Sequence, residues 1–242
     1  MRYGEGILET RNLSMRFGGV VAVNDVDFYL REGELRCLIG PNGAGKSTFF
    51  KCLTGQLKPS EGRVLVRDRD VTGADPFRIA RLGVGIKTQV PSVFEGLTVH
   101  ENLFLAARRE HDRAGARERV ADLLSTLRLE SVASLPVGRL AHGQRQWVEL
   151  GLVLAAEPSL ILLDEPAAGM TVEEVERTAE LLREINRRAT LIVVEHDMHF
   201  IQRIAETVTV FHQGAILMED HWDVVSRDPR VRDVYLGRQV GD

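Results

Sequence analysis

Residues 40–48, GPNGAGKST, combine glycines, a lysine and two hydroxyls in an order that can hold a phosphate chain. Gly40, Gly45, Lys46 and Ser47 fit the pattern G-x-x-x-x-G-K-[ST], between a predicted strand and a predicted helix. A plain glycine turn needs neither the lysine nor the hydroxyl. The stretch therefore predicts a phosphate-binding loop.

Each residue type in this loop has a physical reason to be there. Gly43 and Gly45 let backbone N–H groups turn inward around phosphate oxygens, and the N-terminus of the following helix adds a positive dipole. Lys46 is predicted to pair with the β- and γ-phosphates, and Ser47 to ligate Mg²⁺. The residues expected to contact the nucleotide here are Gly40, Pro41, Asn42, Gly43, Ala44, Gly45, Lys46, Ser47 and Thr48.

Two adjacent acids, Asp164 and Glu165, follow the apolar run LILL. An acid at the carboxyl end of a strand lies where α/β sheets bind ligands, so Asp164 is predicted to hold the metal. Capping of a helix would account for Asp164 but not for a second acid directly after it. Glu165 is predicted to be the general base that takes a proton from the attacking water.

Strands and helices that alternate along the chain must position these groups. Apolar alternation and β-branched residues predict strands, and such strands alternating with helices indicate a parallel sheet with helical crossovers. The predicted strands are residues 7–17, 20–30, 34–40, 62–66, 160–166 and 190–197, with two more around Gly214 within 207–220. Residues 46–57 have helical spacing, and this helix is predicted to end near Gly55. Two more helices are predicted, one over residues 171–188 and one that runs through Ile204.

The middle of the chain, from about Pro91 to Ala156, has a helical character instead. Thr98 and Glu101 are spaced as a capping box at the start of TVHENLFLAARR. Residues 117–130 repeat apolar positions at i, i+3 and i+4. We therefore expect an α/β core with a helical insertion over residues 91–156.

Composition excludes some classes of protein. The 242 residues include 31 Lys and Arg against 35 Asp and Glu, a net charge of −4, which argues against nucleic acid as a partner. Cys37 and Cys52 lie in apolar runs and are expected to pack in the core. No signal peptide and no stretch of ~20 apolar residues is apparent, so we expect a soluble cytoplasmic protein able to dock on a membrane protein.

Further motifs resemble those of one family. Gln89 follows the loop, the segment LAHGQRQ (residues 140–146) precedes Asp164, and His196 ends a strand after Glu165. In this order the motifs resemble the ATP-binding subunits of ABC transporters over nearly the whole chain. The resemblance implies a Mg-dependent ATPase with a P-loop NTPase core, a parallel sheet, an antiparallel β-subdomain and a helical subdomain. It implies one nucleotide-binding domain over residues 1–242, with core and β-subdomain in 1–90 and 157–242 and the helical subdomain in 91–156.

The resemblance also implies roles for single residues. Phe17 resembles the aromatic residue that stacks on adenine, and Val23 is expected to flank the same ring. Gln89 resembles the glutamine that reaches Mg²⁺ or water and links the site to the transmembrane partner. His196 resembles the histidine that contacts the γ-phosphate, whereas His199 is expected to be a surface or packing residue.

In this family two ATPase subunits sandwich two ATP molecules head to tail, and the signature L-S-G-G-Q of one closes on the nucleotide of the other. The segment expected to do so here is Ala141, His142, Gly143 and Gln144. Ala141 lacks the hydroxyl, but the Gly143 N–H keeps an anion site at a helix start. Thr171 stands where an aspartate is usual, and it is spaced with Glu174 as a capping box. We hypothesise that a second subunit with a regular signature completes a heterodimer; a homodimer is the alternative.

Finer features concern the transported solute. RFGGVVAVNDV, EPAAGM and DPRVRDVYLG resemble the branched-chain amino acid uptake group. Within that group, VPSVFEGLTVHENL and the pairing of His142 with Trp147 resemble urea transporter ATPases most. Thr88 departs from the aromatic residue that commonly precedes the glutamine. We therefore predict an importer of urea or short amides, with branched-chain amino acids as the alternative.

Other classes remain as competing readings. A soluble ABC ATPase of translation or DNA repair usually has two fused domains or basic or coiled-coil insertions, and an exporter of lipid is a further alternative. The expected partners are transmembrane permease subunits, a periplasmic solute-binding protein and a second ABC ATPase subunit, with no nucleic acid. The expected location is cytoplasmic, peripheral at the inner face of the plasma membrane. Phe94 is the candidate for contacting the permease, with packing against the helical subdomain equally open.

Overall fold

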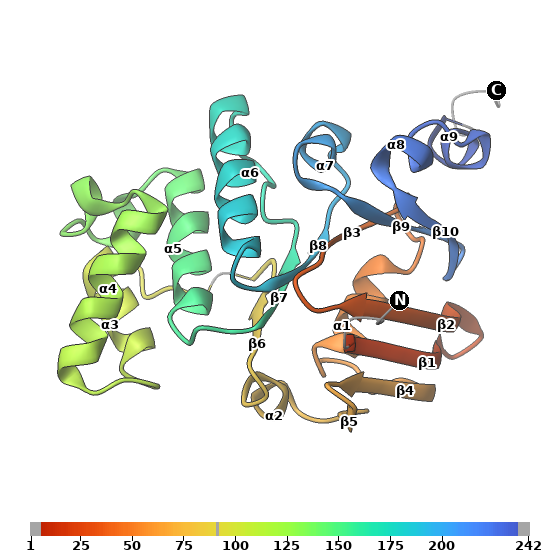
Figure 1. Ribbon diagram of the computed structural model, residues 1–242, viewed down its shortest axis with the longest axis horizontal. Coiled ribbons are helices and arrows are strands. Elements are labelled where there is room, and N and C mark those ends of the chain that lie inside the picture. Colours follow the sequence, from red (N-terminus) through yellow and green to blue (C-terminus); the bar gives the residue numbers. More distant parts are fainter. Residues whose placement is uncertain (1–5, 91, 237–242) are drawn as a thin grey trace.

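The computed structural model describes residues 6–90 and 92–236 and contains two sheets (Figure 1). The six-stranded sheet has the strand order β10-β9-β3-β8-β7-β6. Strands β9, β3, β8, β7 and β6 run parallel, and β10 pairs antiparallel with β9 at one edge. Its strands are β3 (Leu35–Ile39), β6 (Val84–Lys87), β7 (Leu160–Asp164), β8 (Thr190–Val194), β9 (Thr207–His212) and β10 (Ala215–His221). The predicted α/β fold with a parallel sheet is thus confirmed.

The second sheet is antiparallel, in the order β2-β1-β4-β5. Its strands are β1 (Gly6–Phe17), β2 (Val20–Arg31), β4 (Glu61–Val66) and β5 (Arg69–Asp70). Strands predicted over residues 7–17, 20–30 and 62–66 are confirmed.

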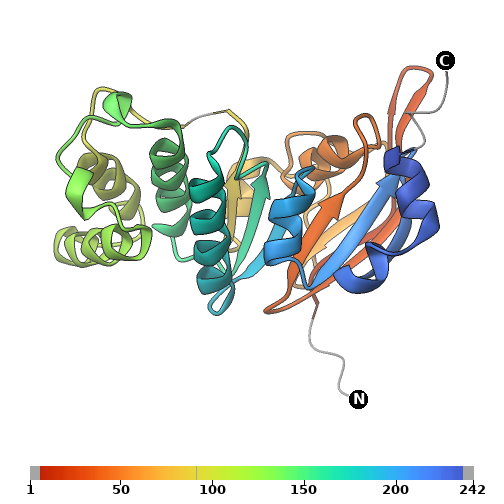
Figure 2. The ribbon, with the colours of Figure 1, turned by 90° about the horizontal axis from the view of Figure 1, so that it is seen from above.

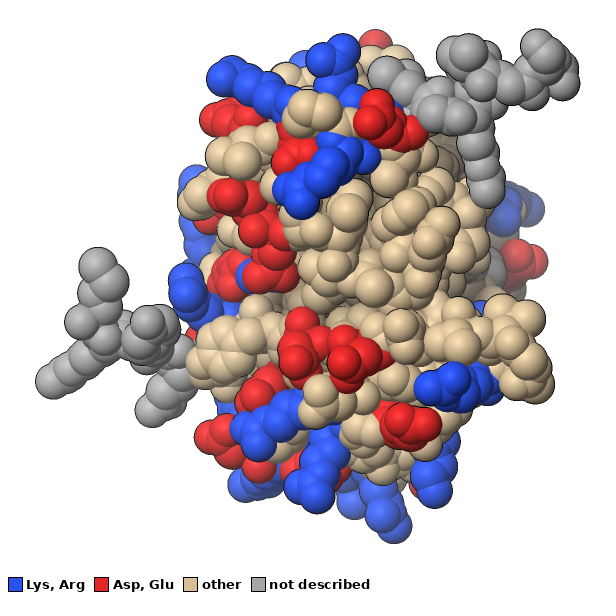
Figure 3. Space-filling view, turned by 90° about the vertical axis from the view of Figure 1, so that its right-hand side faces the viewer, with Lys and Arg blue, Asp and Glu red and all other residues tan. Residues whose placement is uncertain are grey.

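On the end of the molecule drawn in Figure 3, acidic and basic side chains are interspersed.

The core divides into two clusters because neighbouring residues of the parallel strands point to opposite faces. Every residue of β7 and of β8 is buried, as the apolar runs predict. Cys37, Ile161 and Val193 join the cluster under the helices α5 (His142–Leu154), α6 (Val172–Asn186) and α7 (Met198–Ile204). Leu38, Leu162 and Ile192 join the cluster with α1 (Lys46–Leu53) and the antiparallel sheet. Cys37 and Cys52 are both buried and free, which confirms their packing role.

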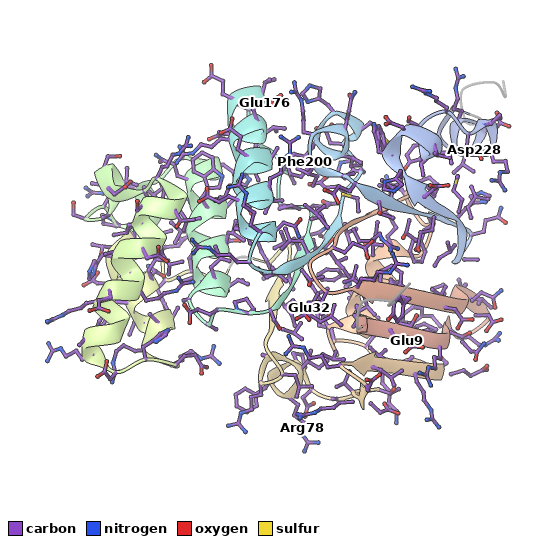
Figure 4. All side chains as sticks on the ribbon, in the orientation of Figure 1. Glu9, Glu32, Arg78, Glu176, Phe200 and Asp228 are labelled. Atoms are coloured by element: carbon purple, nitrogen blue, oxygen red, sulfur yellow. The ribbon has the colours of Figure 1, made fainter. Side chains whose placement is uncertain are left out.

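Three helices, α5, α6 and α7, stand in a row beside the parallel sheet (Figures 1 and 2). Phe200, on the inner side of α7, is fully buried, and its position is labelled in Figure 4. Glu176 of α6 pairs with Arg203 of α7 at 2.8 Å between Oε1 and Nη2. This row fixes the loops at the carboxyl ends of β7 and β8.

The helices of the middle segment lie together at one end of the molecule (Figure 1). They are α3 (Val99–Ala107), α4 (Arg113–Leu127) and α5, with 3₁₀ turns at Glu130–Val132 and Val137–Arg139. The predicted capping box is present: Glu101 N–H donates to Thr98 Oγ1 at 3.1 Å, and Thr98 N–H to Glu101 Oε2 at 2.8 Å. Pro91, the predicted boundary of this segment, lies outside the described residues.

Several boundaries differ from the sequence prediction for local reasons. The helix α4 begins at Arg113 because Asp112 Oδ1 accepts the Gly115 N–H at 2.8 Å, and it ends where Arg128 takes φ 52°. The strand β8 ends at Val194, and Asp197 instead caps α7. Five short elements had no sequence signal strong enough to predict: β5, β6, α2 (Pro76–Ala80), α8 (Trp222–Val225) and α9 (Pro229–Leu236).

Candidate functional site

The loop of residues 40–48 joins β3 to α1 in a backbone conformation that two glycines make possible. A Cβ on Gly45, at φ 105°, would lie 2.4 Å from Ala22 O, and one on Gly40 would lie 2.4 Å from Phe211 O. Gly43 has open space around it but a φ of 80°, which L-residues adopt at a cost. The loop is thus a preformed cradle that ends at the N-terminus of α1.

Lys46 is held inside this cradle. Its side chain is largely buried, and Nζ donates to Gly40 O at 2.5 Å and to Pro41 O at 3.1 Å. Burial lowers the pKa of Lys46, while the carboxylates of Glu165 and Asp164 oppose that shift. Ser47 is exposed and Thr48 half-buried at the start of α1. A cation and a helix N-terminus therefore share the anion site.

Asp164 ends β7 with only 7% of its surface exposed, and its Oδ1 has no hydrogen-bond partner within the described part of the chain. Burial, and then the charge of Glu165, raise the pKa of Asp164 to about 6. An unpartnered buried carboxylate oxygen is the donor a hard cation needs.

The rest of the donor set fits Mg²⁺ as well. Among the described residues, no group of three or more His, Cys, Asp or Glu could form a metal cage. Mg²⁺ commonly binds one or two carboxylates together with substrate phosphates rather than such a cage. Asp164 supplies such a carboxylate, and Ser47, at the start of α1 beside the phosphate cradle, supplies an exposed hydroxyl.

Glu165 and His196 face each other from the ends of β7 and β8. Glu165 has φ 49° and donates its N–H to Val194 O at 2.9 Å, which turns its side chain toward β8. His196 Nδ1 lies 3.3 Å from Glu165 Oε1, and both side chains are partly exposed. A carboxylate and an imidazole in contact at a solvent-facing edge can together accept and hold a proton.

Glu195 is a buried acid that sequence reasoning missed. Its Oε1 accepts the Ala167 N–H at 3.1 Å, and its Oε2 accepts the His196 N–H at 3.1 Å. Burial raises the pKa of Glu195. Its place in the sequence, between an apolar strand and a histidine, was the one signal that could have identified it. It fixes the main chains that carry Glu165 and His196.

Phe17, Val23 and Gln89 occupy three different settings. Phe17 ends β1 with 47% of its surface exposed, as a residue that stacks on a base requires. Val23, which is expected to flank the ring, has a side chain fully buried in the core beside α1. The neighbouring Val20 and Val21 are exposed. Gln89 is exposed two residues beyond β6.

The segment of residues 140–144, called here the signature segment, opens α5. Ala141 is its N-cap and has no side-chain acceptor, although its N–H donates to Gln144 Oε1 at 3.2 Å. His142 Nε2 lies 3.0 Å from Ala168 O. A Cβ on Gly143 would lie 2.3 Å from Glu174 Oε1, so a larger residue there would displace the Glu174 carboxylate.

The residues after Glu165 complete this contact. Thr171 N–H donates to Glu174 Oε2 at 2.9 Å, and Glu174 N–H donates to Thr171 Oγ1 at 3.3 Å, so the predicted capping box is present. Trp147 Nε1–H donates to Thr178 Oγ1 at 2.9 Å, and Arg177 lies over the Trp147 ring. The recorded contacts of the signature segment thus run to α6 and the turn before it.

The structure therefore gathers Lys46, Asp164, Glu165 and His196 at the carboxyl ends of β3, β7 and β8, where parallel sheets bind ligands. The model of the family described as "ABC transporter" matches residues 23–168. The chain belongs to the ABC transporter family.

Curated members of this family match almost the whole chain. "High-affinity branched-chain amino acid transport ATP-binding protein LivG" of Salmonella typhimurium is 34% identical, over 96% of this chain and 98% of the relative. The corresponding protein BraF of Pseudomonas aeruginosa is 33% identical over the same shares.

Solved structures agree with the fold. The ADP conformation of MJ1267, an ATP-binding cassette of an ABC transporter, has a TM-score of 0.85 and 28% identity, over 96% of this chain and 99% of that one. The dimeric post-hydrolysis state of the cassette MJ0796, bound to ADP and Pi, has a TM-score of 0.78 and 25% identity, over 88% and 98%.

This ABC ATPase uses ATP with Mg²⁺, and it is the hydrolysing subunit of an importer that acts with membrane permeases. Within residues 6–90 and 92–236, no helix is long and apolar enough to cross a membrane.

Proposed function

We propose that this ABC ATPase energises the uptake of branched-chain amino acids. The observation that carries the proposal is the match to LivG and BraF, each over 96% of the chain. The sequence had favoured urea or short amides on the pairing of His142 with Trp147. Both residues are held by contacts within this chain, so their presence needs no solute-specific explanation.

The proposed reaction is hydrolysis of the γ-phosphate by an in-line water. Glu165 takes the proton of this water, the new P–O bond forms, and the bond to the ADP oxygen breaks. Lys46 stabilises the charge on the phosphate oxygens. His196, in contact with Glu165, orients the carboxylate and approaches the γ-phosphate.

The remaining residues of the site hold the ligands. Asp164, Ser47 and Gln89 would hold Mg²⁺, which when bound neutralises phosphate charge. Phe17 stacks on the base, and the N–H groups of residues 40–48 surround the phosphates. The Ala141–Gln144 segment serves the nucleotide of a second ATPase subunit, as in the family.

A groove of about 820 Å³ between α2, β6 and α3 is the proposed docking site for a permease segment. Three of its aromatic and aliphatic side chains, Phe77, Phe94 and Leu105, are each about half exposed or more. Phe94 N–H donates to Asn102 Oδ1 at 2.8 Å, and Asn102 Nδ2 donates to Phe94 O at 3.0 Å. The buried Asn102 thus holds the loop while the ring faces outward. This favours permease contact over internal packing for Phe94, and Phe94→Asp should weaken copurification with the permeases.

We further propose the arrangement of the complete transporter. The chain lies at the cytoplasmic face of the plasma membrane on its permeases, and a periplasmic binding protein selects the solute. This chain has two parts, the core with β-subdomain in residues 1–90 and 157–242 and the helical subdomain in residues 91–156. A second ATPase subunit with a regular signature segment supports closure of the ATPase dimer around ATP. Light scattering of Glu165→Gln with ATP tests this, because a tight homodimer would argue against an obligate partner.

Uptake of labelled leucine and labelled urea, in cells of the source organism that lack this chain, tests the solute. Loss of leucine uptake alone is the expected result. Loss of urea uptake alone would overturn the proposal and support the urea prediction. Restoration by the wild-type gene but not by Lys46→Ala would attribute the loss to ATP hydrolysis by this chain.

A further inference from the structure

The N-terminus of α5 is attached to the turn after Glu165 through one imidazole. His142 Nε2 lies 3.0 Å from Ala168 O, three residues beyond Glu165. The ring also covers Gly169, where a Cβ would lie 3.2 Å from Nε2. Gly169 has φ 72°, so the turn passes under the imidazole in a conformation that suits glycine.

Two further side chains hold the ring in place. Gln146 Nε2 lies 3.5 Å from His142 Nε2, and Gln146 Oε1 accepts a hydrogen bond from Lys87 Nζ at 2.5 Å. Lys87 also pairs with Glu149 Oε2 at 3.2 Å, and the side chains of this ion pair are 4% and 5% exposed. A buried charge with two partners is a rigid anchor, because moving it would strand an uncompensated charge.

The contact to Ala168 O fixes which atom of His142 donates, because a carbonyl oxygen requires a donor on Nε2. Lys87 offers only donors, so Gln146 presents its carbonyl to Lys87 and turns its NH₂ group toward His142. An NH₂ group and an Nε2–H are both donors, so the 3.5 Å approach of Gln146 to His142 is a packing contact and not a hydrogen bond. His142 therefore carries its proton on Nε2 and donates it to Ala168 O.

We propose that His142 is a positioning residue for ATP hydrolysis, which fastens the turn bearing Glu165 to the start of α5. The chain of contacts runs from Lys87, two residues before Gln89, through Gln146 and His142 to Ala168. It links the segment beside the permease groove to the signature segment and to the general base. The inference rests on the ATPase activity and not on the identity of the solute.

The exposure of His142 distinguishes a positioning role in hydrolysis from a role in stabilising the core. The residue is exposed, so its side chain contributes little to the core. Losing its N–H should loosen residues 165–171 without lowering global stability. It should also leave ATP binding to the nucleotide loop of the same subunit intact, since residues 40–48 build that loop.

Two variants of similar size test the proposal. His142→Leu has no donor, whereas His142→Gln has an amide that can reach the same carbonyl. Leu should lower kcat about 3- to 10-fold, the size of one lost hydrogen bond, with unchanged ATP affinity of the isolated subunit and unchanged Tm. Hydrogen exchange of residues 165–171 should become faster. Gln should restore most of both properties, and His199→Leu, an exposed histidine on α7, should change neither.

Other outcomes would overturn the proposal. One is a His142→Leu variant whose kcat and whose hydrogen exchange in residues 165–171 match the wild type. The other is a His142→Gln variant that loses as much activity as His142→Leu. Gln146→Met provides a second entry to the same contacts, and its effect should not add to that of His142→Leu. The exchange measurement needs no turnover, so it reports on the His142 contact even if the roles assigned to Glu165 and Lys46 fail.

Discussion

The nucleotide loop and the signature segment both place backbone N–H groups at the start of a helix, but they are held in opposite ways. Residues 40–48 keep their shape through glycine conformations and a lysine that bonds its own loop. Residues 140–144 keep theirs through the Glu174 side chain of α6 and the Ala168 carbonyl after β7, and Gln146 connects them to Lys87 of β6. A site set by local backbone survives alone, whereas a site set by distant contacts responds to its neighbours.

The two regions also differ in whether their polar groups have partners within the chain. At the nucleotide loop, Asp164 has an unpartnered buried oxygen and a raised pKa, and Lys46 has a lowered pKa. At the signature segment, His142 Nε2 is paired with Ala168 O, and Lys87 is paired with Gln146 and Glu149. Unsatisfied buried charge marks the place that a ligand completes. Satisfied polar contacts mark the place that transmits position.

The largest expected effect lies at the nucleotide loop. Lys46→Ala removes the cation that faces the phosphates, so phosphate release should fall about 100- to 1,000-fold. Measured ATP binding should weaken as well. Lys51→Ala, on the following turn of α1, is the matched control. Equal losses in both variants would remove the special role of Lys46.

The glycines of this loop should differ sharply in what they tolerate. Gly45→Ala brings a Cβ to 2.4 Å from Ala22 O at φ 105°, and should cost about 2–5 kcal/mol of unfolding free energy. Gly43→Ala meets no atom within 4 Å and should cost about 1–2 kcal/mol. Urea denaturation without ATP measures both, and a larger loss in Gly43→Ala would contradict the local account.

A buried hydrogen bond behind the signature segment should have an intermediate effect. Thr178→Val leaves the Trp147 indole N–H without its acceptor at 2.9 Å, which should destabilise the fold by about 1–3 kcal/mol. Thermal unfolding checks this. Thr178→Ser keeps the hydroxyl and should lose less; if the two variants match, the hydrogen bond is not the cause.

Asp164 makes stability depend on pH in a defined direction. Its pKa is raised from 3.8 to about 6 in the folded chain, so between these values the folded chain binds more protons than the unfolded one. The free energy of unfolding therefore falls as pH rises through this window. Asp164→Asn should remove that dependence and gain about 1–2 kcal/mol at pH 7 without nucleotide, after allowance for solvent screening. Identical pH profiles in both proteins would refute this.

The smallest effect concerns the cap of α5. Ala141→Ser supplies the acceptor that the N-cap lacks, and should stabilise the chain by about 1 kcal/mol. The expected readout is a rise in Tm of a few degrees, with Ala141→Val as the control that adds bulk but no acceptor. A lower Tm for the serine variant would mean that the segment is not held as described.

Much of the nucleotide site could be predicted from sequence, because its geometry is local. The pattern from Gly40 to Ser47, and the acids after an apolar strand, carry their chemistry in adjacent residues. The structure adds that these groups meet at the ends of β3, β7 and β8. The burial of Val23 was not predictable, because an apolar residue near Phe17 can face either the ring or the core. Sequence spacing alone does not decide which.

The supports of the site were not predictable in the same way. Glu195 is one acid after an apolar run, and its partner Ala167 comes within reach only once β7 and β8 lie side by side. Lys87 and Glu149 are far apart in sequence and pair only because α5 packs against β6. His142 was singled out for its pairing with Trp147, and its contact with Ala168 has no sequence signature.

Single-turnover hydrolysis by Glu165→Gln tests the central claim most directly, that the end of β7 holds the base beside a preformed nucleotide loop. ATP binding and phosphate release are measured on the same protein. The account predicts that ATP binds as tightly as to the wild type and that phosphate release slows by about 100-fold or more. Near-normal phosphate release would contradict it and assign the proton to another group.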